Sequence, residues 1–208
     1  GEYLLLDETT CLNLDLVPMR ARPKENTLLG VLDSTLTPMG ARLMRTYLQR
    51  PSGKLAEVRR RHDAVDWFAQ NRMAMSALRS TLGDVRDIER LIARVGSGLG
   101  NGRDLKTLGQ SLAAIPQLKK PLTDCQNELI CHLVSLLNEL PELVKTLNDA
   151  LADTPPIALH EGGIIRDGYN ADLDEFRRLA GDGRSWLLNY QTAEQQRTGI
   201  KTLKVRHN

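Results

Sequence analysis

The sequence predicts an all-α fold, a multi-helix bundle with long helices and only short extended elements. Apolar residues make up 41% of the chain and leucine dominates them, whereas aromatic residues contribute only 4%. Strands draw on β-branched and aromatic side chains, so this balance favours helices. Apolar residues also recur at the three- and four-residue spacing of amphipathic helices along much of the chain.

The first quarter of the chain contains three helix-start signals. Asp7 is expected to cap a brief helix and Asn26 a second short one, because their side-chain oxygens accept the free N–H groups of a first turn. Thr37 followed by Pro38 is the clearest signal, since threonine is a good N-cap and proline loses no hydrogen bond at the first helical position. Pro51 then ends this third helix.

The middle of the chain predicts a series of further helices. The apolar pattern from Leu55 to Leu82 indicates two helices with a bend near Asn71. Asp84 is expected to cap the next helix, and Asp104 the one that follows a glycine-rich break.

The last third combines helices with one irregular stretch. Two amphipathic helices separated at Pro141 are predicted between residues 124 and 151. Residues 154–170 lack helical period, and glycine turns flank Ile164 and Ile165, which predicts a short extended element.

A long final helix follows this stretch. Asn170 is expected to cap it, Gly181 and Gly183 weaken its middle, and Gly199 ends it. The alternation of apolar residues after Gly199 is typical of the start of a strand.

Bulk properties limit the functional classes. The net charge of +2 is too small to indicate nucleic-acid binding by itself. Seven basic residues and one acid nevertheless fall between Arg42 and Arg61, which is typical of a solvated helix face or, as the alternative, of a phosphate-facing surface. Three cysteines without a C-x-x-C pair favour a reducing, cytoplasmic setting. No apolar run is long enough to cross a membrane.

No catalytic, cofactor-binding or metal-binding residue is predicted. The G-x-x-x-x-G-K-[ST] pattern of a P-loop does not occur, and the glycines between Gly96 and Gly102 lack dinucleotide-binding spacing. Cys125 and Cys131 are six residues apart, which would place them on different faces of a helix, so both are interpreted as small core residues.

One group of residues is singled out as a structural corner, formed by Asp33, Thr37, Gly40 and Arg42. Asp33 and Thr37 offer oxygens just before a helix, Gly40 suggests close approach by another backbone, and Arg42 is near enough in sequence to pair with Asp33. The corner is expected to fix how two helices meet. A ligand or DNA contact at this turn is the alternative.

Six segments in this order resemble the central part of the MutS DNA mismatch-repair family. They are LLLDETTCLNLDL (residues 4–16), VLDSTLTPMGARLMRTYLQRP (31–51), DVRDIERLIAR (84–94), GRDLKTLGQSL (102–112), EGGIIRDGYNADLDEFR (161–177) and TGIKTLKVRHN (198–208). The resemblance covers nearly the whole chain. It implies a fragment with a helical core/lever domain over residues 1–198 and the first strand of an incomplete clamp domain over residues 199–208.

The resemblance also implies a role in the parent protein. That protein is expected to be an ATP-dependent sensor of mismatches in double-stranded DNA that uses ATP and Mg, forms a homodimer and recruits a MutL-type repair factor. The family's mismatch-reading aromatic residue, nucleotide-binding lysine and metal-binding groups have no counterpart here. The fragment is therefore expected to be a mechanical link without cofactor or activity of its own.

Two alternatives from other classes are a stand-alone helical adaptor and a helical enzyme with a dispersed site. A further expectation concerns the final helix. Because the helix that would return beside it lies outside this chain, its apolar stripe is expected to be partly exposed. The stripe comprises Leu173, Phe176, Trp186, Leu187 and Tyr190.

Overall fold

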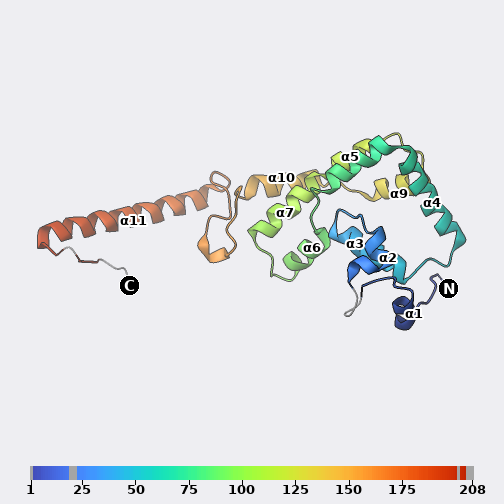
Figure 1. Ribbon diagram of the computed structural model, residues 1–208. Helices are drawn as coiled ribbons and strands as arrows, with labels where there is room; N and C mark the ends of the chain where they lie inside the picture. Colours follow the sequence, from blue (N-terminus) through green and yellow to red (C-terminus); the bar gives the residue numbers. More distant parts are fainter. Residues whose placement is uncertain (1, 19–22, 201, 205–208) are drawn as a thin grey trace.

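The computed structural model describes residues 2–18, 23–200 and 202–204 and is all-α over them, as predicted (Figure 1). Extended structure within these ranges is limited to two isolated antiparallel bridges, Tyr3 with Ser52 and Leu151 with Ile165. The second bridge confirms the short extended element predicted after residue 154. Helices α1 to α10 form an elongated body, and α11 projects away from it.

The first three α-helices are α1 (Glu8–Asn13), α2 (Leu28–Leu32) and α3 (Pro38–Gln49). Asp7 caps α1 and Thr37 caps α3, with the predicted proline at the first position of α3. The predicted cap of α2 is wrong. Thr27 accepts the hydrogen bond from Gly30 N at 3.1 Å, because Asn26 already belongs to a 3₁₀ turn over Lys24–Asn26.

The next pair is α4 (Leu55–Gln70) and α5 (Arg72–Leu82). The single residue between them is Asn71, which confirms the predicted bend. Its side-chain amide donates to the carbonyl oxygen of Trp67 at 2.8 Å, so it closes the last turn of α4.

The caps predicted for α6 (Ile88–Gly96) and α7 (Gly102–Ala113) are wrong. Asp87, not Asp84, accepts the hydrogen bond at the start of α6. Asn101, not Asp104, caps α7, and Asp104 accepts from the Asn101 N–H in return, so the two residues form a capping box. Asp84 lies too far before α6 to cap it, and Asp104 is already the third residue of α7.

The body ends with α8 (Ile115–Lys119), the 3₁₀ turn η2 (Lys120–Leu122), α9 (Glu128–Leu136) and α10 (Pro141–Ala150). Pro141 stands at the first position of α10, in agreement with the predicted separation there. Leu140 before it is left-handed, with φ of 48°.

Two small apolar clusters hold the body together over the described residues. Residues from α4, η2 and α9 and the turn between them form the first, and residues from α6, α7 and α8 form the second. Their buried members are Ala64, Leu122, Cys125 and Ile130 in the first cluster, and Leu91, Leu108, Leu112 and Ile115 in the second. Helix α10 packs on α7, where Gly109 leaves room for Leu147.

Helix α11 spans Ala171–Thr198 and has 28 residues, a length of roughly 42 Å. Asn170 caps it and Gly199 ends it, both as predicted. It continues through Gly181 and Gly183 without a break. None of its side chains that the structure describes is buried, which confirms the expected exposure of the stripe, with Phe176 at 68% and Trp186 at 64%.

Beyond α11, residues 199, 200 and 202–204 form no strand, whereas 201 and 205–208, which complete the predicted clamp strand, lie outside the described residues. Within the described ranges, no helix combines the length and the apolar character that a membrane span requires.

The contact at Gly102 generates a prediction about stability. A Cβ atom there would lie 2.9 Å from Cβ of Pro155 and 3.0 Å from Cγ2 of Ile164, so Gly102→Ala is expected to destabilise the fold by about 1–3 kcal/mol. The matched control is Gly181→Ala, where a Cβ meets nothing within 4 Å and helix propensity improves by up to about 1 kcal/mol. Denaturant unfolding followed by circular dichroism measures both. A Gly102→Ala variant as stable as the parent chain would contradict the packing described here.

Candidate functional site

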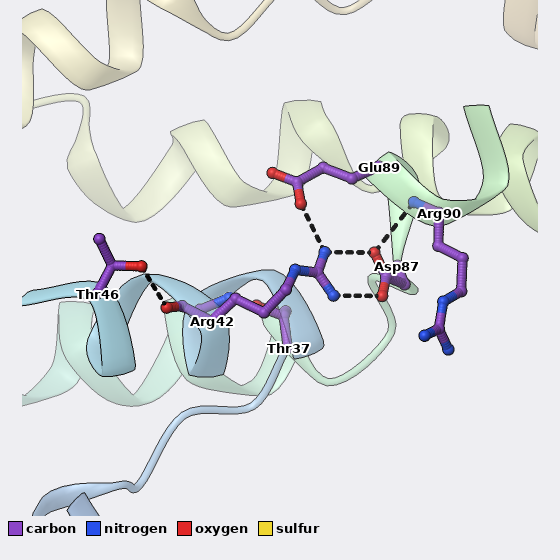
Figure 2. Close-up of polar contacts among 7 residues, drawn as sticks. Thr37, Arg42, Thr46, Asp87, Glu89 and Arg90 are labelled. Carbon is purple, nitrogen blue, oxygen red and sulfur yellow. Dashed lines mark hydrogen bonds and ion pairs between the residues drawn. The ribbon is translucent and has the colours of Figure 1, made fainter. Parts of the chain in front are cut away.

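Of the predicted corner residues, Thr37, Gly40 and Arg42 lie at the start of α3, and Asp33 ends α2. Figure 2 shows the Arg42 side chain directed towards the start of α6. Arg42 is one turn into α3 and reaches across to Asp87 and Glu89. Its Nη1 lies 2.7 Å from Asp87 Oδ2 and its Nη2 lies 2.8 Å from Asp87 Oδ1, a bidentate pair, and Nη2 also contacts Glu89 Oε2. Planar guanidinium and carboxylate groups match best in this geometry.

The predicted pairing of Arg42 with Asp33 is wrong. Asp33 instead contacts Lys24 Nζ at 2.8 Å and accepts from the hydroxyl of Thr35 at 2.6 Å. These contacts hold its pKa at about 2, chiefly through the hydrogen bond from Lys24. Arg42 is carried away from Asp33 because α3 begins at Pro38 and turns its side chain towards α6.

The reason inferred for Gly40 is also wrong. A Cβ atom at this position would meet the Thr37 hydroxyl oxygen at 3.1 Å and the Thr35 side chain at 3.5 Å, rather than another backbone. Its N–H donates to the same Thr37 oxygen. Gly40 therefore makes room for the capping threonine, and the corner is built from side chains of its own turn.

Asp87 performs two tasks with one carboxylate. It accepts the Arg90 N–H at 3.2 Å as the N-cap of α6 and holds the Arg42 guanidinium on the same group. The hydrogen bond from Arg42 is the main reason that the pKa of Asp87 falls to about 2. The same pairing raises the pKa of Arg42.

The backbone beside Asp87 is fixed from the other side by Ser111 of α7, whose side chain is fully buried. Its hydroxyl accepts the Arg86 N–H at 3.0 Å and donates to the Thr107 carbonyl at 3.0 Å. A buried hydroxyl with both functions satisfied is a rigid attachment. Asp87 is thus held by α7 while it holds α3.

A second arginine ties the other end of the corner to the body. Both terminal nitrogens of Arg79 on α5 donate to the Ser34 carbonyl at 3.1 Å. We use the name arginine junction for Ser34, Arg42, Arg79, Asp87 and Glu89. Arg42 and Asp87 are 45 residues apart in sequence, as are Ser34 and Arg79, so no local pattern could have revealed these partners.

Most of the basic run between Arg42 and Arg61 is engaged within the chain, which weakens its interpretation as a phosphate-facing surface. Arg61 pairs with Glu57 and lies 3.9 Å over the Tyr47 ring. Within the described residues, Arg50 and Arg59 are the members whose side chains make no hydrogen bond or ion pair. The engaged pairs are Arg42 with Asp87 and Glu89, Arg45 with the Pro18 carbonyl, Lys54 with Glu2, Arg60 with Glu57 and Glu128, and Arg61 with Glu57.

The carboxylates of the junction are paired with arginine. Among the described residues, no group of three or more His, Cys, Asp or Glu side chains is placed to hold a metal ion. The junction joins α3 to the start of α6 through charged hydrogen bonds.

Two variants of Asp87 separate its tasks. Asparagine caps helices as well as aspartate does, so Asp87→Asn is expected to keep the cap and lose the charge pairing with Arg42. Asp87→Ala is expected to lose both, with about 1 kcal/mol from the cap alone. Denaturant unfolding at neutral pH is the measurement, and equal stability of the two variants would argue against the capping role.

The second measurement for these variants is the free energy of unfolding as a function of pH in the acid range. The folded-state pKa of Asp87, at about 2, lies below its ordinary value of 3.8, so its contribution is present above pH 3.8 and is lost as the pH falls towards 2. Asp87→Asn should flatten the stability curve within that window. An unchanged acid limb would mean that the Arg42 pair contributes nothing in solution.

Comparison with known proteins identifies the family of the chain. The family model described as MutS domain III matches residues 9–202. Proteins described as DNA mismatch repair protein MutS align with the whole chain, at 41% identity in Symbiobacterium thermophilum, 41% in Myxococcus xanthus and 42% in Chlorobaculum tepidum. The chain covers 24%, 23% and 24% of those proteins, so it spans about a quarter of their length. The chain belongs to the MutS domain III family.

Proposed function

We propose that this chain is the core/lever segment of an ATP-dependent DNA mismatch-recognition protein, in which it links the DNA clamp to the ATPase. The relatives that align with it are named for DNA mismatch repair. The observation that carries the proposal is an unbroken path of specific contacts from α11 through the body to α3. Transmission between distant sites requires packed elements connected in this way.

The path begins at the base of α11. Arg177 contacts Asp167 at 2.7 Å and the Ile165 carbonyl at 2.8 Å, and Asp174 accepts the Gly168 N–H at 2.8 Å. These contacts attach the first turns of α11 to the stretch that precedes it. A force on the helix therefore reaches this stretch before any other part of the body.

The stretch is in turn attached to α10 and α7. The bridge between Leu151 and Ile165 is flanked by hydrogen bonds from Ala152 N to Ile164 O at 2.9 Å and from Arg166 N to Ala150 O at 2.8 Å. Arg103 near the start of α7 also donates to the Pro155 carbonyl at 2.7 Å. From α7 the path continues through Ser111 to the arginine junction.

The complete protein supplies the remaining activities in this proposal. It would bind mismatched double-stranded DNA as a homodimer, use ATP and Mg in a separate ATPase domain, and recruit a MutL-type repair factor in the cytoplasm. The chain itself would contribute stiffness and connection rather than catalysis, with Asp33, Thr37, Gly40 and Arg42 as the corner that fixes α3.

A stand-alone helical adaptor is the second candidate, and the exposed face of α11 favours it. Phe176, Leu179 and Trp186 are all more than half exposed, and such a stripe can bind a partner. The two candidates differ in what α11 must do. A lever must stay straight between its ends, whereas an adaptor needs only the surface.

The lever proposal is tested in the full-length protein by Gly181→Pro, with Gly181→Ala as the matched control. Proline removes a backbone hydrogen bond inside the helix and breaks it, at a cost of about 3 kcal/mol, whereas alanine fits the open space there. The proline variant is expected to hydrolyse ATP but to lose the effect of ATP on DNA dissociation. The measurements are ATP turnover and dissociation of a fluorescent mismatched duplex with and without ATP. Intact coupling in the proline variant would contradict the lever role.

Titration of the chain alone tests where mismatch specificity lies. With fluorescent matched and mismatched duplexes at two salt concentrations, we expect weak, salt-sensitive and equal binding, reduced by Arg50→Ala with Arg59→Ala. The two arginines are chosen because neither is paired within the described residues. Discrimination between the duplexes would show that the chain reads mismatches itself and would overturn the proposal.

A further inference from the structure

Cys125 and Cys131 lie together, contrary to the prediction that they occupy different faces of a helix. Helix α9 begins at Glu128 with Asn127 as its cap, so Cys125 precedes the helix and Cys131 lies in its first turn. The Cys131 thiol donates to the Cys125 carbonyl oxygen at 3.0 Å. The chain therefore folds back on itself at this point and places one cysteine beside the other.

The two thiols differ in their access to solvent. Cys125 is 8% exposed and packs with Ala64, Leu122 and Ile130, whereas Cys131 is exposed. Burial raises the pKa of the Cys125 thiol, and the neighbouring Cys131 thiol raises it further, against a hydrogen bond from the Asn127 backbone that lowers it. An oxidant in solution thus reaches Cys131 first, and its sulfur lies 3.0 Å from the backbone carbonyl oxygen of Cys125 and close enough to affect the Cys125 thiol.

We propose that Cys125 and Cys131 are a redox pair that closes to an intramolecular disulfide when the protein meets a peroxide. The Cys131 thiolate attacks one oxygen of hydrogen peroxide, the O–O bond breaks, and a sulfenic acid and one water form. The Cys125 sulfur then attacks the Cys131 sulfur, the S–O bond breaks, and a second water leaves. In total the two thiols lose two electrons and two protons, and the peroxide takes up both.

The disulfide would act on a point where several elements meet. Helix α9 packs on α4 and on η2, and α5 packs on η2 and α8 (Figure 1). In the reduced protein, the first turn of α9 is joined to the preceding turn by the Asn127 cap and the thiol hydrogen bond. Oxidation replaces the weak thiol contact with a covalent bond and fixes α9 to the first apolar cluster. Reversible disulfides of this kind occur in reducing compartments as sensors.

The test uses mass spectrometry after peroxide treatment, with alkylation of the remaining thiols under denaturing conditions. Trypsin leaves both cysteines on one peptide, and cleavage after Glu128 separates them because this residue lies between the two. We expect a loss of two hydrogen atoms, no alkylation of Cys125 or Cys131, and two fragments that stay linked after cleavage at Glu128 until a reductant is added. Hydrogen exchange of residues 125–131 should slow in the oxidised form.

Two variants serve as controls. Cys131→Ser removes the exposed thiol and is expected to abolish the linkage, whereas Cys11→Ser changes a buried cysteine of α1 and should leave it intact. In Cys125→Ser the sulfenic acid on Cys131 should persist and react with a dimedone probe. The proposal is overturned if Cys131 proceeds to sulfinic or sulfonic acid while Cys125 stays alkylatable, or if Cys131 links two chains instead.

Discussion

The Asp87 carboxylate is the group on which the position of α3 depends. All residues of α3 are described by the structure and none of them is buried, so no core contact fixes this helix. Its main charged contact is made by Arg42, which meets a carboxylate that also caps α6 and whose backbone neighbour is anchored by Ser111. Packing against α2, the contact of Arg45 with the Pro18 carbonyl and the stacking of Arg61 on Tyr47 add to it. One group therefore serves both the start of α6 and the contact with α3, so local and tertiary structure are linked at this point.

The rest of the body also has few buried apolar residues. The two apolar clusters join helices that are close in sequence or immediately adjacent in space, and they leave α11 outside. Helix α11 is consequently rigid through its own backbone hydrogen bonds and not through packing. Within its described part this 28-residue helix has no buried side chain, so the contacts of Arg177 and Asp174 at its base are what attach it to the preceding stretch.

Helix caps could be predicted from the sequence where one residue was clearly marked as the cap, and not where two nearby residues were both able to cap the helix. Thr37 and Asn170 are correctly predicted as caps, Thr37 because Pro38 directly after it marks the first helical position and Asn170 because it lies directly before the long helical pattern. Asp84 is the cap that the sequence predicts for α6, whereas Asp87 caps it in the structure, because both precede the helix and only the folded backbone decides which carboxylate meets a free N–H group. The partner of Arg42 and the contact between Cys125 and Cys131 depend on where helices begin, which spacing alone does not specify.

The distribution of contacts also determines where motion between α11 and the body can occur. From α3 to α10, each step of the path is either a bidentate ion pair, a satisfied buried hydroxyl or close helix packing. Between residues 152 and 170 it consists of one bridge with two flanking hydrogen bonds, the contact of Arg103 with the Pro155 carbonyl, and exposed ion pairs such as Arg166 with Asp153. Exposed pairs resist bending weakly, because solvent replaces them at little cost. In the proposed lever role, bending between α11 and the body is therefore expected at residues 152–170.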